Sequence, residues 1–432
     1  MSLKDDLKKA LVSKVMARRL SQEGTAARRA KVEKKRMKQG LPHRVDFFHQ
    51  VDDPYSLLAA RALKPLQKRY DIELKVHIVG APDDAMVPQR AKLKAYSRRD
   101  ASLIAPKYGL KFAHCDQDPD AAEIDKANAV LVQAVEDDTI LDVIDAVSTA
   151  LWSGQSLPTL PMAKGENTQE HQVKAARLRK QLGHYLGAAF CYGGESYWGL
   201  DRLHYLEERL QALGADKHPA AAPLYPAPLA RSKGTQSAGS KKAPEKPIDF
   251  FVSLRSPYSA IVAKRVFEAA RSADAQVRIR YVLPMVMRGL QVPREKALYI
   301  VHDAAREAHR LDVPFGQFND PLGLPTERGL SLMPLAQDKG VSEAYLLSFL
   351  EGVWAEGINA GTDRGLRTIA ERAGLVWSDA QLALEDDGWR AIAEANRQEL
   401  FDLGLWGVPS FHCGDALLWG QDRLWALEEA LH

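Results

Sequence analysis

The chain has 432 residues, of which 46% are hydrophobic and 27% are charged. These values are typical of a globular protein and exclude a fibrous or largely disordered one, and the length is sufficient for two domains with a core each. The formal net charge of +3 is unevenly distributed: residues 1–44 hold 14 Lys and Arg against 4 Asp and Glu, whereas the rest of the chain holds 45 against 52.

The three cysteines are Cys115, Cys191 and Cys413. No two of them form a C-x-x-C pair, and none has neighbours at the spacing of metal ligands. This usage is typical of a reducing compartment. No apolar run approaches the length of a membrane span, and the first residues lack the apolar core of a signal peptide. We therefore expect a cytoplasmic protein that binds no metal.

The first segment, residues 1–43, is predicted to be a basic helical extension over residues 2–39. Leu7, Leu11 and Val15 form only a weak apolar stripe. We favour a solvated extension; the alternative is a basic patch for nucleic acid or another anionic surface. A nucleic-acid partner is the less favoured of the two, because no aromatic side chains interleave to stack on bases.

The next part of the chain alternates between strand and helix signals. The alternation of apolar and polar residues predicts strands, and Asp53 followed by Pro54 is a strong helix start. The segments predicted in order are a strand over 45–49, a helix over 56–69, a strand over 72–79, a mostly helical region over 87–154, a helix over 169–182, a strand over 189–192 and a helix that opens at Asp201.

Residues 215–247 contain six prolines together with Ala, Ser, Gly and Lys, which predicts a linker. A second set of elements follows it, with strands over 248–252 and 276–281, a helix that starts at Ser256-Pro-Tyr258, a strand over 410–413 after Pro409, a turn at Gly414-Asp415 and a helix that Asp422 opens. We therefore divide the chain into an extension (1–43), a first domain (44–214), a linker (215–247) and a second domain (248–432).

The two domains carry corresponding motifs. Trp198-Gly-Leu-Asp-Arg-Leu-His-Tyr-Leu-Glu-Glu208 aligns with Trp419-Gly-Gln-Asp-Arg-Leu-Trp-Ala-Leu-Glu-Glu429. At an offset of 203, Pro54 matches Pro257 and Phe112 matches Phe315; Trp152 pairs with Trp354 at 202. Each copy reads β-α-β, a long helical insertion, and then a strand, a turn, an optional second strand and a helix. The prediction is an α/β protein of two tandem thioredoxin-like domains, each with a helical insertion.

The second copy, residues 248–432, resembles the 2-hydroxychromene-2-carboxylate isomerase family, the DsbA-like branch of the thioredoxin fold that also holds kappa-class glutathione transferases. The first copy shows a fainter version over residues 44–210. The motifs that carry the resemblance are Ser256-Pro-Tyr-Ser259, Val292-Pro-Arg-Glu-Lys-Ala-Leu-Tyr299, Val353-Trp-Ala-Glu-Gly357, Gly407-Val-Pro-Ser-Phe411 and Trp419-Gly-Gln-Asp-Arg423.

Ser256 matches the family's catalytic serine. A hydroxyl at a helix N-terminus can donate to a bound thiolate, which the helix dipole also favours. Taken alone, Ser-Pro is an ordinary helix cap; the other motifs favour the catalytic role.

The resemblance also implies a set of residues for glutathione. Pro409 matches the cis-proline of thioredoxin folds, which lets the Val408 backbone pair with the cysteinyl part of glutathione. Gln421 and Asp422 match positions that hold the γ-glutamyl end, although Asp422 is also an ordinary first-turn acid. Lys296 matches a lysine that would pair with a ligand carboxylate.

Both copies depart from the family pattern. Ser253 stands where the family commonly has Asp, and Arg255 precedes the serine where a small or apolar residue is usual; Arg255 either holds an anionic substrate or faces solvent. In the first copy Asp53 replaces the serine and Ala188 replaces the cis-proline. A carboxylate would repel a thiolate. We therefore expect a degenerate first domain.

The leading functional hypothesis is a glutathione-dependent isomerase or transferase that acts on a small unsaturated carboxylate. The absence of C-x-x-C argues against a disulfide oxidoreductase. The alternative is a non-catalytic binding or scaffold protein whose two copies form an intramolecular pseudo-dimer, with the basic N-terminal helix engaging a partner or nucleic acid.

Overall fold

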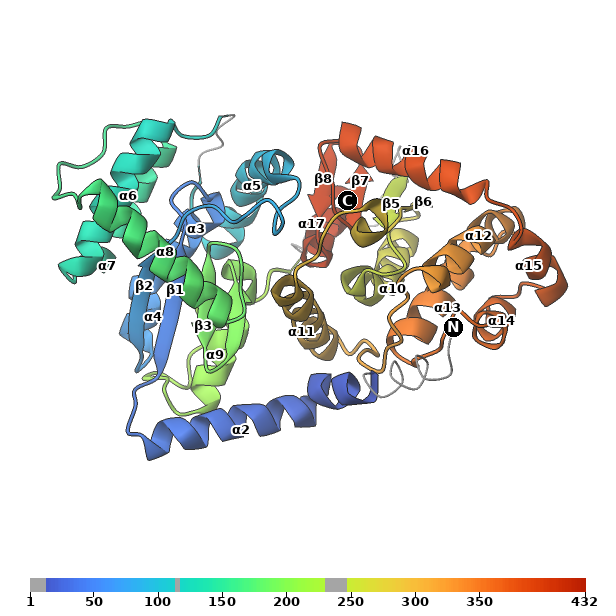
Figure 1. Cartoon of the computed structure of the whole chain (residues 1–432), viewed down its shortest axis with the longest axis horizontal. Helices are drawn as coiled ribbons and strands as arrows, with labels where there is room; N and C mark the ends of the chain where they lie inside the picture. The colour runs from blue at the N-terminus through green and yellow to red at the C-terminus, as the bar shows by residue number, and fades with distance from the viewer. Residues whose placement is uncertain (1–12, 113–116, 230–246) are drawn as a thin grey trace, which may run out of the picture. The chain divides into compact units, whose positions relative to one another are not determined.

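The computed structural model describes residues 13–112, 117–229 and 247–432. Cys115, residues 1–12 and most of the predicted linker therefore lie outside the described residues. The chain divides into two compact units (Figure 1). The C-terminal unit comprises Met1–Ala27, Leu229–Val292 and Ile300–His432, and the N-terminal unit comprises Arg28–Pro228 and Pro293–Tyr299.

The N-terminal unit is built on a mixed four-stranded sheet. Its strands, in the order β2-β1-β3-β4 across the sheet, are β1 (Arg44–His49), β2 (Glu73–Ile78), β3 (Ala189–Tyr192) and β4 (Glu195–Trp198). Strands β1 and β2 run parallel, and the other pairs are antiparallel. Every residue of β1 after Arg44 is buried, because both faces of a strand at this position are covered.

Helices surround this sheet. They are α2 (Gln22–Lys38), α3 (Pro54–Ala60), α4 (Leu63–Arg69), α5 (Arg90–Ile104), η1 (Ala105–Tyr108), α6 (Ala121–Glu136), α7 (Ile140–Trp152), α8 (Gly165–Gln181), η2 (Leu200–Arg202) and α9 (Leu203–Ala212). Only the part of α2 from Arg28 onward is assigned to this unit. The single helix predicted over 56–69 is divided into α3 and α4. Pro65 explains the break, since it cannot donate to the carbonyl of Arg61 and its ring crowds that carbonyl.

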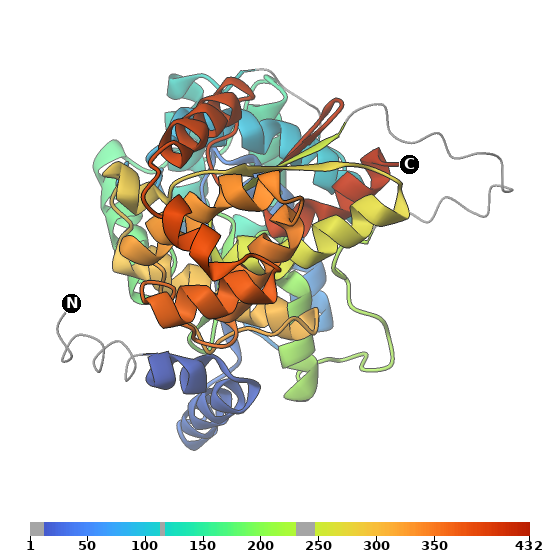
Figure 2. The same ribbon diagram turned by 90° about the vertical axis from the view of Figure 1, so that its right-hand side faces the viewer.

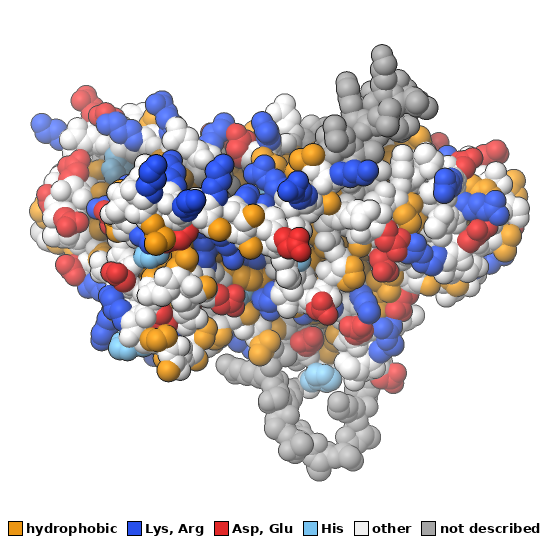
Figure 3. All heavy atoms as spheres, turned by 90° about the horizontal axis from the view of Figure 1, so that it is seen from below, with side chains coloured by type: hydrophobic (Ala, Val, Ile, Leu, Met, Phe, Trp, Pro, Cys, Tyr) orange, Lys and Arg blue, Asp and Glu red, His pale blue; other side chains and the backbone are white. Residues whose placement is uncertain are grey.

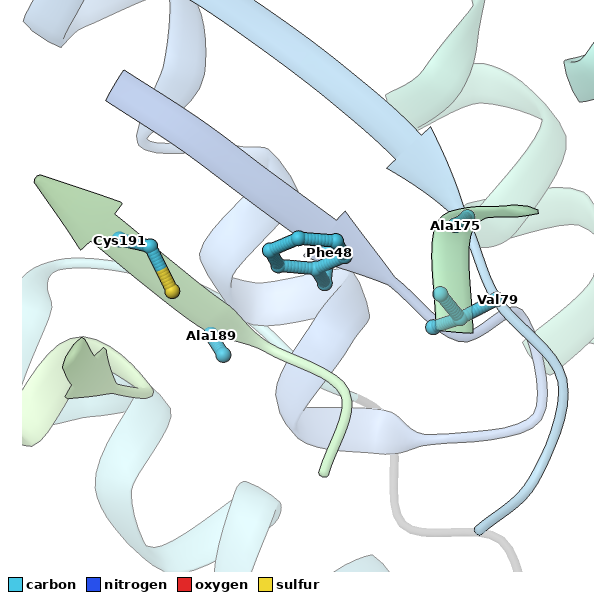
Figure 4. Packing of buried hydrophobic residues seen from close by; sticks show 5 residues of the cluster. All are labelled: Phe48, Val79, Ala175, Ala189 and Cys191. Atoms are coloured by element: carbon cyan, nitrogen blue, oxygen red, sulfur yellow. The ribbon is translucent and has the colours of Figure 1, made fainter. Parts of the chain in front are cut away.

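The packing of α8 on the sheet buries one cluster of apolar side chains (Figure 4). Phe48 of β1, Ala189 and Cys191 of β3, Val79 after β2 and Ala175 of α8 form it. All of these side chains are at most 4% exposed. Two further leucines of the same segment, Leu178 and Leu182, pack against the cluster. The helix that leads back to β3 is thereby fixed on one face of the sheet.

The C-terminal unit repeats the sheet. Its strands, in the order β6-β5-β7-β8, are β5 (Ile248–Val252), β6 (Val277–Tyr281), β7 (Ser410–Cys413) and β8 (Ala416–Trp419). The parallel and antiparallel pairs follow the same pattern as in the first sheet. The predicted α/β class, with two sheets of the same plan, is confirmed.

The helices of the C-terminal unit include a long insertion between β6 and β7, drawn mainly in orange in Figure 2. The elements are α10 (Pro257–Ser272), η3 (Met285–Arg288), α11 (Arg294–Arg310), α12 (Leu324–Asp338), α13 (Ser342–Trp354), α14 (Asp363–Arg372), α15 (Trp377–Ala383), α16 (Trp389–Asp402), η4 (Gln421–Arg423) and α17 (Leu424–Ala430). The first residues of α11, up to Tyr299, are assigned to the N-terminal unit. Asp422 was predicted to open the last helix; it lies instead inside η4, and α17 begins two residues later.

Matching contacts support the correspondence between the copies. The indole of a tryptophan donates to the chain just after the first strand, and a tyrosine hydroxyl near the start of the first helix donates to an aspartate 45 positions on. The pairs are Trp152 with the Val51 carbonyl (3.0 Å), Trp354 with the Leu254 carbonyl (3.1 Å), Tyr55 with Asp100 (2.7 Å) and Tyr258 with Asp303 (2.8 Å).

The first part of the predicted linker packs onto the N-terminal unit. Asp216 forms a buried ion pair with Arg69 at 2.9 Å. The carboxylate of Glu207 accepts the backbone N–H groups of Leu224 at 2.7 Å and Tyr225 at 2.8 Å. These bonds attach residues 216–225 to the unit and give the buried carboxylates of Asp216 and Glu207 hydrogen-bond partners.

Candidate active site

Ser256 joins the start of a helix to the loop before β7. Its hydroxyl oxygen caps α10 by accepting the backbone N–H of Ser259 at 3.1 Å, and Pro257 occupies the first helical position. The same hydroxyl donates its proton to the carbonyl of Val408 at 3.3 Å. A small turn of this O–H would present the proton to a ligand at the helix N-terminus.

The loop of Val408 and Pro409 is held at both ends. The Val408–Pro409 bond is cis, as expected. The carbonyl of Gly407 accepts the hydroxyl of Ser410 at 2.7 Å, and the carbonyl of Pro409 accepts the N–H of Gly420 at 2.9 Å. Within the described residues, the N–H of Val408 makes no hydrogen bond. This donor therefore remains for a ligand that pairs with the backbone.

Two tryptophans determine the packing around Gly407. The rings of Trp406 and Trp419 lie 4.8 Å apart between centroids. A Cβ atom on Gly407 would come within 2.6 Å of the indole nitrogen of Trp419, closer than van der Waals contact allows. Glycine is therefore required for the loop to approach β8 this closely.

Gln421 is buried and bonded inside the domain. Its amide nitrogen donates to Glu307 at 2.7 Å, and Arg310 lies 3.2 Å from the same carboxylate oxygen. Among the described residues the amide oxygen of Gln421 has no hydrogen-bond partner. The amide nitrogen of Gln421 is thus hydrogen-bonded to α11. Only the amide oxygen would be available to accept a hydrogen bond from a ligand.

Asp422 lies in η4, which packs against α10, the helix that Ser256 caps. Its side chain is 19% exposed, and the carboxylate lies 3.7 Å from the guanidinium of Arg423. A partly exposed carboxylate next to the helix that carries the serine is suitably placed for an ammonium group.

Lys296 is not grouped with the other predicted site residues, since it belongs to the segment Pro293–Tyr299 of the N-terminal unit. Its ammonium group donates to the carbonyl of Met86 at 2.7 Å and lies 5.6 Å from the ring centroid of Tyr185. Burial lowers the pKa of Lys296 to about 8. In the structure this lysine is bonded to the chain itself.

Arg255 has a partner that the sequence did not indicate. Its guanidinium forms two hydrogen bonds with the carboxylate of Asp320, at 2.8 and 2.9 Å, close to the surface. The position directly before Ser256 thus holds a charge that is neutralised but accessible. Ser253 is buried, and its carbonyl accepts the N–H of Ser256 at 3.0 Å. Its hydroxyl has no hydrogen-bond partner within the described residues.

In the first copy the position of Ser256 is taken by Asp53. The carboxylate caps α3 by accepting the N–H groups of Tyr55 and Ser56, both at 3.2 Å, and the hydroxyl of Ser56 at 2.8 Å. Burial raises the pKa of Asp53 to about 7. The carboxyl group therefore satisfies the helix start from within the chain.

Ala188 occupies the place of the cis-proline. Its carbonyl accepts the N–H of Gly199 at 2.8 Å, as the carbonyl of Pro409 accepts that of Gly420. Unlike proline, Ala188 has an N–H, which donates to the hydroxyl of Ser56 at 2.8 Å, and its φ of 54° lies in the left-handed region. The backbone and side-chain groups that could face a ligand are thus bonded to one another.

The described cysteines offer no nucleophile in the first copy. Burial raises the pKa of the Cys191 thiol to about 12, and its sulfur lies 3.3 Å from the hydroxyl of Ser196. Cys413 is also buried and not disulfide-bonded. Within the described ranges, no three His, Cys, Asp or Glu side chains are grouped so that they could hold a metal ion. No helix there is long and apolar enough to cross a membrane.

Residues 247–432 match the family model of the DSBA-like thioredoxin domain. The match is confined to this half of the chain. The chain is 25% identical to 2-hydroxychromene-2-carboxylate isomerase of Sphingobium xenophagum over 43% of this chain and 98% of that protein. It is 21% identical to the isomerase of Pseudomonas sp. strain C18 over 43% of this chain and 89% of that protein.

Solved structures give the same kind of similarity. A 2-hydroxychromene-2-carboxylate isomerase structure matches with 23% identity and a TM-score of 0.37, over 43% of this chain and 93% of that one. The cytosolic disulfide reductase DsbM of Pseudomonas aeruginosa, solved with GSH, matches with 18% identity and a TM-score of 0.33, over 42% of this chain and 96% of that one.

Proposed function

We propose that the C-terminal domain is a glutathione-dependent isomerase or transferase in which Ser256 stabilises the thiolate. The observation that carries this proposal is the position of the Ser256 hydroxyl, at the N-terminus of the 16-residue helix α10 and 3.3 Å from the carbonyl that precedes Pro409. The distant similarity to 2-hydroxychromene-2-carboxylate isomerases supports it.

The residues of the loop fit a peptide-like cofactor. The N–H of Val408 is without a hydrogen bond among the described residues, so it can donate to a carbonyl of the cysteinyl part. Asp422 would receive the α-ammonium of the γ-glutamyl end. When bound, glutathione would supply a thiolate that adds reversibly to a double bond conjugated with a carboxylate, so that this bond can rotate before elimination.

The protein's part in this reaction is electrostatic. The N-terminus of α10 favours a negative charge at Ser256, and the hydroxyl would donate to the sulfur in place of the Val408 carbonyl. The carboxylate of the substrate would replace that of Asp320 on Arg255, because a guanidinium binds either carboxylate with the same two-bond geometry. In this proposal Arg255 binds the carboxylate of the substrate, and Ser256 stabilises the thiolate of glutathione.

Titration of bound glutathione tests the role of Ser256. In Ser256→Ala the thiolate loses one hydrogen bond to a charged group, about 1.5–3 kcal/mol, so its pKa should rise by about one to two units. Affinity should change less, because the contacts at Val408 and Asp422 remain. The measurement is the ultraviolet absorbance of the thiolate against pH, for wild type and variant.

Two further variants separate thiolate stabilisation from helix capping. Ser256→Asp keeps a capping side chain but repels the thiolate, so it should raise the thiolate pKa at least as much as Ser256→Ala. Ser259→Ala removes a buried hydroxyl with no hydrogen bond among the described residues and should leave the titration unchanged. If the titration curves of wild type, Ser256→Ala and Ser256→Asp coincide, Ser256 only caps the helix and does not stabilise the thiolate.

A further inference from the structure

One face of helix α2 is fixed to the N-terminal unit by ion pairs. The guanidinium of Arg29 forms two hydrogen bonds with the carboxylate of Glu195, at 2.7 and 2.8 Å. Arg36 bonds to Glu33 at 2.6 Å, one turn earlier, and also donates to the carbonyl of Leu41. Because a helix advances by about 100° per residue, positions 29, 33 and 36 share one side. These side chains are all partly buried.

The opposite side carries four lysines. Lys31, Lys34, Lys35 and Lys38 are spaced at i, i+3, i+4 and i+7, which places them together and about 180° from the face of Arg29. All four are exposed. Figure 3 looks onto this side of the molecule and shows Lys and Arg side chains gathered along the helix. We call this set the lysine face.

The charges of the lysine face are not neutralised by the part of the chain that the structure describes. No acidic residue stands three or four positions from any of the four lysines. Among the described residues none of the four has a side-chain salt bridge or hydrogen bond, whereas the acids nearby, Glu33 and Glu195, bond to the arginines on the other side. Like charges at this spacing destabilise a helix. The stability of α2 therefore does not explain why its ion-paired arginines lie on one side and its lysines on the other.

We infer that the lysine face binds the phosphate backbone of a nucleic acid without reading its sequence. Lysine ammonium groups on flexible stems suit closely spaced phosphates, and the absence of aromatic side chains along the face leaves no means of stacking on bases. A membrane surface fits less well, because an interfacial helix needs an apolar face. The large apolar residues here, Val32 and Met37, lie on opposite flanks of the lysines.

The salt dependence of binding tests this inference in the full-length protein. The probes are a short labelled DNA duplex of mixed sequence and a labelled single strand, followed by fluorescence anisotropy. Four phosphate contacts should give a slope of log affinity against log salt near −3.6 for the duplex and about −2.8 for the single strand, from about 0.9 and 0.7 per contact. Scrambling the probe sequence should leave affinity unchanged.

The variants assign the slope to the lysine face. Replacing Lys31, Lys34, Lys35 and Lys38 by Gln should remove most of it, with an unchanged melting temperature showing that the fold is kept. The control replaces four other exposed lysines of the same unit, Lys64, Lys68, Lys174 and Lys180, and changes net charge equally; three of these four form surface ion pairs. The inference would be overturned if both variants lost affinity for the probes equally or if the wild type bound neither probe at low salt. Binding only to vesicles that contain phosphatidylserine would also overturn it.

Discussion

At the scale of single residues, the two copies differ most at the start of the first helix. Ser256 presents a hydroxyl that a ligand could take over from Val408, whereas the carboxyl of Asp53 is bonded to Tyr55 and Ser56. Ser256 therefore has a hydroxyl proton that can turn toward a ligand, whereas the carboxyl of Asp53 is bonded within its own chain.

The raised pKa of Asp53 predicts a pH dependence of stability. Burial raises this pKa from 3.8 to about 7, so between these values the unfolded state releases the proton that the folded state keeps. The free energy of unfolding should therefore fall as the pH rises from about 4 to 7. The fall should stay below about 4 kcal/mol, the value for about three pKa units, because part of Asp53 reaches solvent.

Asp53→Asn should flatten this profile, since the amide does not titrate. The measurement is urea unfolding at several pH values between these limits, with the exposed Asp84→Asn as the control for loss of a charge. If Asp53→Asn and wild type keep the same slope, the carboxyl of Asp53 does not carry the proposed proton.

The sequence could predict those site features that depend on local pattern. Ser256 and Pro257 are recognisable as a helix start, and Pro409 with the strand after it indicates the loop. The partners of Arg255 and Gln421 could not be predicted, because Asp320 and Glu307 approach them only through the folding of the long insertion. Each pair is far apart along the chain, so no short stretch of sequence indicates the contact.

At the scale of elements, the same local rules explain where the copies agree and where they differ. Six of the eight strands in the described residues were predicted within one residue of their bounds, because the central strands of both sheets are strongly apolar. No bounds were predicted for β4 and β8, the short edge strands that follow the turns after β3 and β7. The helix after β1 breaks at Pro65, whereas the corresponding helix α10 has Glu268 at that position and continues unbroken to Ser272. A continuous α10 gives Ser256 the N-terminus of a longer helix.

The contact between α12 and α13 predicts a steric effect. A Cβ atom on Gly329 would lie 2.3 Å from a ring carbon of Phe349 and 2.7 Å from Leu254, and the Gly329 carbonyl already accepts the hydroxyl of Tyr345 at 2.8 Å. Gly329→Ala should therefore destabilise the C-terminal unit by about 1–3 kcal/mol. Thermal unfolding measures this effect.

Gly165→Ala is the matched control, since nothing lies within 4 Å of its added Cβ and it begins α8. It should leave stability unchanged or slightly raised. Equal melting temperatures for both variants and wild type would show that α12 and α13 are packed less closely than the structure indicates.

At the scale of the whole molecule, the chain combines two sheets of one plan with unequal sites. Backbone groups and buried side chains close the site of the N-terminal unit, whereas the loop at Val408 retains an N–H without a hydrogen bond among the described residues. Basic residues are concentrated before the first strand. We therefore propose small-molecule chemistry for the C-terminal domain and electrostatic binding for α2.

Calorimetric titration of the full-length protein with glutathione tests whether the C-terminal domain alone holds the active site. We predict one site per chain, in the C-terminal domain. Ser256→Asp should weaken binding by at least about tenfold, or about 1.4 kcal/mol, when the thiolate is the bound form. Asp53→Asn should leave both stoichiometry and affinity unchanged. Two equivalent sites, no binding, or a Ser256→Asp variant that binds as tightly as wild type would contradict the assignment of the active site to the C-terminal domain.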